Sequence, residues 1–135
     1  MKVLVLGLAL SLSSLSALAD VSVIVNPGNS SAVSADMVKK IYLGKTKSFG
    51  NGISVAPMNQ DGTALADEFN DKVVGKSSSQ LNAYWAKLVF TGKGTPPAKA
   101  PSDQAVIDFV ASTSGAIGYV DSASVNDKVK VVAKF

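Results

Sequence analysis

The residues Asp61, Gly62, Thr63 and Ala64 carry the clearest chemistry in this sequence. They lie where a turn leads into an apolar helical stripe, so the backbone N–H groups of Gly62, Thr63 and Ala64 would be free at a helix N-terminus. Such groups attract anions, and the Thr63 hydroxyl would add a donor. Asp61, however, is an anion at the same place and is predicted to cap the helix itself. At about 4 Å two like charges repel by roughly 1 kcal/mol in water, so capping and anion binding compete here.

Other chemistry is limited by the residue types that the chain contains. Its 135 residues include no histidine, cysteine or arginine, and all 13 basic residues are lysines. A disulfide, a thiolate nucleophile, a Cys/His zinc site and a histidine general base are therefore excluded, as is bidentate arginine recognition of phosphate. Paired carboxylates such as Asp61 with Asp67 or Glu68 would be the remaining route to an enzyme, but no spacing marks such a pair. We expect no enzymatic activity, no metal and no cofactor.

The start of the chain has the pattern of a secretion signal. Lys2 precedes the apolar run 3–12, and Ala-Leu-Ala at 17–19 has the small-x-small pattern of a signal peptidase site. The apolar run is shorter than the roughly 20 residues that a membrane span needs. Residues 1–19 are therefore predicted to be a cleaved signal peptide and 20–135 a single domain, which places the protein in the periplasm. No cysteine stands at the cleavage site, so lipid attachment there is excluded.

Charge is nearly balanced once Lys2 is set aside, with 12 lysines against 10 acidic side chains. The densest positive group follows a predicted helix and is interpreted as its solvated end. It consists of Lys39, Lys40, Lys45 and Lys47. Nucleic acid would require a clustered basic face with aromatic or arginine contacts, so no nucleic-acid partner is expected. Membrane insertion is not expected either once the signal is removed.

The elements that position these residues are predicted from hydrophobic periodicity and turn residues. Short apolar runs bounded by breakers predict strands at 21–25, 53–57, 116–120 and 129–135. Helices are predicted to begin near Ser34, Asp61, Ser77 and Ser102, and the first two to end at Gly44 and Gly75. The segment 91–101, rich in glycine and proline, is predicted to be a loop. Strands alternating with helices indicate an α/β domain.

The longest predicted helix carries a single apolar face. Its members are Leu81, Tyr84, Trp85, Leu88 and Val89. We interpret Tyr84 and Trp85 as core residues rather than as a platform for a ligand. The following Gly92-Lys93-Gly94-Thr95 lacks the spacing of a phosphate-binding loop and is interpreted as structural.

Two phrases of the chain resemble the phosphate-type periplasmic substrate-binding proteins of ABC transporters. They are Ile41-Tyr42-Leu43-Gly44-Lys45 and Gly115-Ala116-Ile117-Gly118-Tyr119-Val120, which in that family end a helix and begin a strand of the same lobe. Asn26-Pro27, and Phe90-Thr91-Gly92-Lys93-Gly94 before Pro96-Pro97, resemble short single-lobe members of the group. The order of these phrases extends the resemblance from about Val21 to Phe135. It implies a single lobe of the type II periplasmic-binding-protein fold, with a mixed β-sheet flanked by helices.

The resemblance also implies where a ligand would bind and what this chain lacks. Complete family members have two lobes that close around the ligand, and this chain is long enough for one. The family's ligand segment, Arg-x-x-x-Ser-Gly-Thr leading into a helix, is most similar to residues 57–63. Gly62 and Thr63 match, but Pro57 stands at the arginine position and Asp61 at the serine position. The arginine that short members can carry a few residues into the helix is missing too.

The resulting expectation is a periplasmic, non-enzymatic solute-binding domain that binds phosphate or a related anion for an ABC transporter. The ligand would bind at Asp61–Ala64, with Lys45 or Lys93 supplying charge. The alternative is a single-lobe interaction module that has lost ligand binding and docks on a protein assembly through the face left bare by the absent lobe. The implied partners are a small anion, and an ABC permease or another envelope protein.

Overall fold

A five-stranded sheet organises the computed structural model, which describes residues 20–135. Its strands are β1 (Val21–Val25), β2 (Ala56–Gln60), β3 (Ala98–Ala100), β4 (Ala116–Asp121) and β5 (Lys130–Lys134). The helices are α1 (Ala35–Tyr42), α2 (Ala64–Phe69), α3 (Ser78–Phe90) and α4 (Asp103–Ser112). A π-helical turn, η1 (Asn70–Val74), continues α2, and a 3-10 turn, η2 (Ser122–Ser124), follows β4. The predicted signal peptide lies outside the described residues, among which no helix is long and apolar enough to cross a membrane.

The strands lie in the order β3-β2-β4-β1-β5, and the sheet is mixed. Strand β2 runs parallel to both β3 and β4, whereas β1 runs antiparallel to β4 and β5. The carboxyl ends of β2, β3 and β4 therefore meet at one edge of the sheet, and the loop between β2 and α2 begins at that edge. This arrangement confirms the predicted α/β fold class with a mixed sheet flanked by helices.

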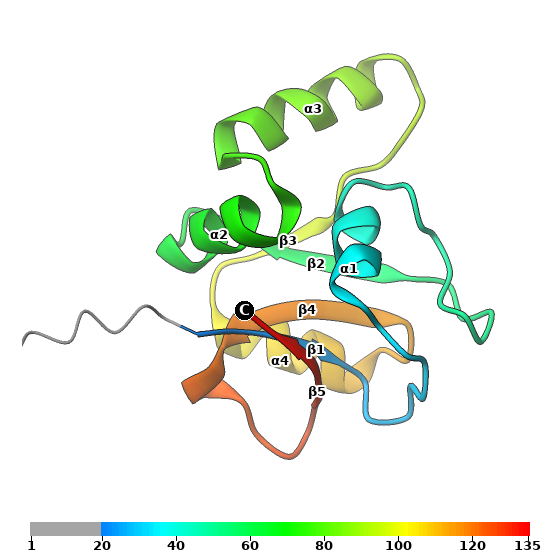
Figure 1. Ribbon diagram of the computed structural model, residues 1–135, viewed down its shortest axis with the longest axis vertical. Coiled ribbons are helices and arrows are strands. Elements are labelled where there is room, and N and C mark those ends of the chain that lie inside the picture. The colour runs from blue at the N-terminus through cyan, green and yellow to red at the C-terminus, as the bar shows by residue number, and fades with distance from the viewer. Residues whose placement is uncertain (1–19) are drawn as a thin grey trace, which may run out of the picture.

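Strand β1 lies between two apolar cores, and all five of its residues are buried. Its alternating side chains Val21, Val23 and Val25 pack in the larger core with α1, α2 and α3, and Ile24 packs with α4 in the smaller one. Helices thus cover both faces of the sheet (Figure 1). A continuous apolar run of this kind is what a strand covered on both faces requires.

Three aromatic rings join α1, α2 and β4 inside the larger core. Phe69 stacks on Tyr119 with ring centroids 3.8 Å apart, and the edge of Tyr42 meets Phe69 at 4.8 Å. All three side chains are fully buried. The Tyr42 hydroxyl donates to the carbonyl of Met58 at 2.9 Å, so this cluster also fixes β2, which leads to the candidate site.

Burial changes the acidity of the two tyrosines in this cluster. It raises the pKa of Tyr42 well above the ordinary value of about 10, and the nearby Tyr119 adds to that rise. Burial also raises the pKa of Tyr119, although the hydrogen bond from the Gln60 backbone opposes the effect. Both groups therefore keep their protons in the folded chain at a pH where the unfolded chain loses them.

This difference predicts a loss of stability at alkaline pH. Below pH 10 both states hold the tyrosine protons, so the contribution to stability is fully present. Above pH 10 the unfolded state binds fewer protons, and the free energy of unfolding should fall by up to about 1.4 kcal/mol per pH unit for each tyrosine. Urea unfolding between pH 8 and pH 11 measures this slope. Tyr42→Phe should show a shallower fall, and an unchanged slope in that variant would contradict the account.

Two predicted boundaries are wrong, each because of contacts distant in sequence. The second strand was predicted at 53–57 but lies at Ala56–Gln60, because Asn59 and Gln60 find buried hydrogen-bond partners. The predicted loop 91–101 contains β3, which pairs with β2. A third prediction is wrong as well: Val89, placed on the apolar face of the longest helix, is 53% exposed and belongs to neither apolar core of residues 20–135.

Candidate functional site

The carboxyl end of β2 is held rigidly by buried polar contacts. The Gln60 N–H donates to the hydroxyl of Tyr119 at 3.1 Å, and that hydroxyl donates to the side-chain oxygen of Asn59. The Gln60 side-chain amide donates to the Asp103 carboxylate at 2.7 Å and to the Tyr119 carbonyl at 3.0 Å. The loop that follows Gln60 is therefore positioned by both β4 and α4.

Helix α2, which follows this loop, is capped by Thr63, so the prediction that Asp61 caps it is wrong. The Thr63 hydroxyl oxygen accepts a hydrogen bond from the Ala66 N–H at 3.1 Å. Asp61 instead still belongs to the sheet edge, where its N–H donates to the Ala100 carbonyl at 3.0 Å. Gly62, at φ +68°, makes the turn between them, a backbone conformation that favours glycine.

The donors available to an anion here are backbone N–H groups. None of the hydrogen bonds found among residues 20–135 uses the N–H of Gly62 or Thr63, and the Ala64 N–H lies in the first turn of α2, where a helix has no internal acceptor. The Thr63 hydroxyl hydrogen is already donated to the Gln60 side-chain oxygen at 2.8 Å. The predicted extra donor is therefore engaged within the protein.

The charged side chains around the loop, Lys99, Asp61 and Asp103, sum to a net negative charge. The Asp61 side chain is 71% exposed, and its carboxylate lies 4.0 Å from the ammonium group of Lys99. Asp103, behind the loop, accepts hydrogen bonds from Gln60, the Asp121 N–H and the Ser124 hydroxyl. A dianion at the loop would thus meet one lysine, one exposed carboxylate and one carboxylate that is already satisfied.

The two helix carboxylates considered as catalytic partners of Asp61, those of Asp67 and Glu68, are engaged in contacts within the protein. Asp67 accepts a hydrogen bond from the Ser78 hydroxyl at 2.5 Å, and Glu68 pairs with Lys72 along the helix. In the described part of the chain, no three acidic side chains gather closely enough to hold a metal ion. These contacts favour a structural role for the acidic side chains of α2.

Replacing Thr63 tests whether the cap fixes this loop. Thr63→Ala should lower the free energy of unfolding by about 1–2 kcal/mol, because it removes the N-cap and also leaves the Gln60 side-chain oxygen without its donor. Thr63→Ser retains the hydroxyl, so its free energy of unfolding should fall much less. Chemical denaturation of both variants checks this, and equal losses would show that the methyl group, rather than the hydroxyl, matters.

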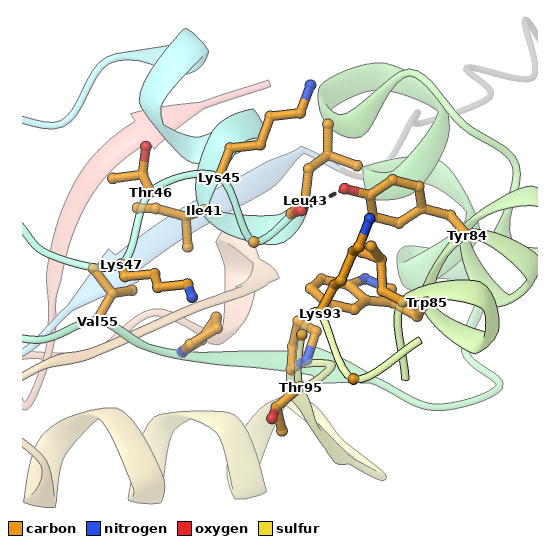
Figure 2. Close-up of a pocket in the computed structure, with 16 residues that line it drawn as sticks. Ile41, Leu43, Lys45, Thr46, Lys47, Val55, Tyr84, Trp85, Lys93 and Thr95 are labelled. Carbon is orange, nitrogen blue, oxygen red and sulfur yellow. Dashed lines mark hydrogen bonds between the residues drawn. The ribbon is translucent and has the colours of Figure 1, made fainter. Parts of the chain in front are cut away.

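A cavity of about 760 Å³ lies at the opposite end of β2. We call it the lysine cavity, because Lys45, Lys47 and Lys93 line it together with the rings of Tyr84 and Trp85 (Figure 2). Its lining includes Val55 and Pro57 at the start of β2 but none of residues 61–64. The prediction that Lys45 or Lys93 supplies charge to the β2–α2 loop is therefore wrong.

Sequence reasoning missed this cavity because its lysines come from distant loops. Lys45 and Lys47 follow α1, and they were interpreted as part of a solvated helix end; this holds for Lys40, which is exposed and pairs with Asp36 at 2.9 Å. Lys93 follows α3 in a segment interpreted as structural. Trp85 belongs to the core as predicted, whereas Tyr84 is partly buried and packs against the core, and both also line the cavity. The one local signal of this cavity in the sequence was the pair of glycines, Gly92 and Gly94, that flank Lys93.

Comparison with solved structures identifies the fold. Neither a protein-family model nor a curated protein matches the chain. An ABC-type phosphate transport receptor from Vibrio cholerae is similar with a TM-score of 0.64 and 15% identity, over 84% of this chain and 46% of that one. A putative phosphate ABC transporter substrate-binding protein with bound phosphate from Clostridium perfringens has a TM-score of 0.65 and 20% identity, over 84% of this chain and 45% of that one. PstS from Borrelia burgdorferi has a TM-score of 0.63 and 14% identity, over 85% of this chain and 47% of that one.

The chain spans less than half the length of each of these proteins. Its fold is that of a single lobe of a type II periplasmic binding protein, as the resemblance implied.

Proposed function

We propose that the chain is a periplasmic, non-enzymatic solute-binding domain that takes a small oxyanion at the loop between β2 and α2, with phosphate as the first ligand to test. The observation that carries this is the set of free N–H groups of Gly62, Thr63 and Ala64. They follow a strand end that is held rigidly, on a fold otherwise found in proteins described as phosphate-binding. The predicted signal peptide would deliver the domain to the periplasm, where an ABC permease would be its partner.

The charges around the loop set the expected strength of binding. Without arginine, the anion is held by backbone dipoles and by Lys99, which also attracts Asp61. The Asp61 carboxylate repels a bound oxyanion, by roughly 1 kcal/mol at about 4 Å in water. We therefore expect modest affinity that falls as the salt concentration rises.

Removing the Asp61 charge is the most direct test of this proposal. Asp61→Asn should bind phosphate about fivefold more tightly, which corresponds to the roughly 1 kcal/mol of repulsion removed. Isothermal titration of the purified protein with phosphate, and separately with sulfate, measures the change. Asp127→Asn is the matched control, because it removes an exposed carboxylate from the loop before β5. Equal affinities in both variants, or no saturable heat in either, would overturn the proposed site.

Docking on an envelope protein is a second candidate function, and one observation favours it. Phe90 at the end of α3 is 92% exposed and Val89 is 53% exposed. They border a largely apolar hollow of about 500 Å³ that includes Pro96 and Pro97. Exposed apolar groups gathered in this way mark interaction surfaces in soluble proteins.

A photo-crosslinker placed at position 90 in intact cells tests this second function. One defined envelope partner, absent when the crosslinker stands at the exposed Lys128 and lost when Val89 is replaced by Asp, would support it. The same products from both positions would exclude it.

A further inference from the structure

The lysine cavity has the size and the lining of a site for a small molecule. Its volume of about 760 Å³ lies within the range of roughly 300–1,000 Å³ that ligand sites occupy. The apolar part of the wall comes from Val55, Pro57, Trp85 and Leu88, and the polar residues of the lining are three lysines, two threonines and Tyr84. Among residues 20–135, no aspartate or glutamate lines it.

The two loops that bring the lysines are held against one indole ring. A Cβ on Gly44 would lie 2.6 Å from Cη2 of Trp85, and one on Gly94 would lie 3.2 Å from Cζ3. The residues that follow Gly44 and precede Gly94 are Lys45 and Lys93, so the same ring positions both lysine-bearing segments. Tyr84 adds a second anchor, because its hydroxyl donates to the Leu43 carbonyl at 2.6 Å. The cavity is therefore built by the core and not by a chance meeting of surface side chains.

The positive charge in the cavity is not balanced by the protein. Within residues 20–135, Lys45, Lys47 and Lys93 take part in no salt bridge, whereas Lys40, Lys72 and Lys99 each pair with a carboxylate. In Figure 2 the amine of Lys47 points toward the open centre, that of Lys93 lies in front of Trp85 beside the ring of Tyr84, and that of Lys45 extends away. An anion with two separated charges could contact Lys47 with one of them and Lys93, on the Trp85 side of the cavity, with the other.

We propose that the lysine cavity binds a small organic anion that carries two or more carboxylates on a flat carbon frame. The frame contacts the apolar wall beside Trp85, and the carboxylates contact Lys47 and Lys93. Inorganic phosphate would leave this wall uncovered. The site and the class of ligand are therefore distinct from the oxyanion proposed at the β2–α2 loop, and neither proposal depends on the other.

The sole tryptophan of the chain provides the readout, because Trp85 lines the cavity. Benzene-1,3,5-tricarboxylate, added to the purified protein at low salt, should change the Trp85 fluorescence along a saturable curve. Benzoate, which has the same ring and one charge, should bind about fivefold more weakly for each lysine contact that it loses. Lys47→Gln and Lys93→Gln should each weaken binding of the tricarboxylate by about fivefold. The matched control Lys128→Gln, with the same change of net charge, should leave it unchanged.

The other outcomes overturn the proposal. Equal affinities for benzoate and the tricarboxylate would show that the lysines do not act together. An equal loss in the Lys47, Lys93 and Lys128 variants would show that only net charge matters. A tricarboxylate that binds more tightly to Asp61→Asn but normally to Lys47→Gln would place the ligand at the β2–α2 loop instead.

Discussion

Replacing Phe69 with alanine should lower the free energy of unfolding by about 3–5 kcal/mol, a large part of the stability of a domain of this size. The ring is fully buried, and it stacks on Tyr119 while contacting the edge of Tyr42. Its loss would leave a cavity where α1, α2 and β4 meet, and the surrounding rings cannot close that cavity without moving the backbone.

Phe90→Ala is the matched control for this prediction. It removes the same ring from a position that is 92% exposed, so stability should change by no more than about 0.5 kcal/mol. Urea unfolding of both variants gives the comparison. Similar losses in the two would contradict the placement of Phe69 at the centre of the core.

Gly44→Ala should lower the free energy of unfolding by about 2–5 kcal/mol, because the added methyl group destabilises the fold in two independent ways. Gly44 has φ +72°, where a side chain costs roughly 1–2 kcal/mol. The new Cβ would also lie 2.6 Å from the indole of Trp85, and overpacking of a core of this kind typically costs about 1–3 kcal/mol. The variant should also disturb the lysine cavity, since Gly44 and Trp85 both line it.

Gly52→Ala separates the two penalties. Gly52 has φ +83°, but no atom lies within 4 Å of the position that a Cβ would take. In this variant the free energy of unfolding should fall only by the cost of a side chain at positive φ, about 1–2 kcal/mol. Thermal or chemical unfolding measures both, and equal losses would mean that Trp85 does not press against Gly44.

Local signals in the sequence were sufficient for the helix starts. Ser34 and Ser102 each cap a helix as predicted, and Ser77 caps the helix predicted to follow the serine cluster, because a cap depends on a side chain and an N–H group three residues later. Asp61 was the exception. Its N–H pairs with Ala100 just beyond the end of β2, and the cap passes to Thr63; no local pattern could show that pairing.

The candidate sites depended still more on contacts that are distant in the chain. Asn59 and Gln60 resemble turn residues, but Tyr119 and Asp103 satisfy their polar groups and allow β2 to include them. The lysine cavity required Trp85 to bring the segments at 45–47 and 93–95 together. Periodicity predicted that Trp85 packs in the core, but it could not show which loops the indole would contact.

The most direct test of the proposed function is a titration of the isotopically labelled protein with phosphate, followed by the amide signals of its nuclear magnetic resonance spectrum. Our account predicts that the N–H signals of Gly62, Thr63 and Ala64 move together along one saturable curve, because these groups donate to the anion. The signals of Lys47 and Lys93 should stay in place. Stationary signals at 62–64 under excess phosphate, or movement confined to the lysine cavity, would contradict oxyanion binding at the β2–α2 loop.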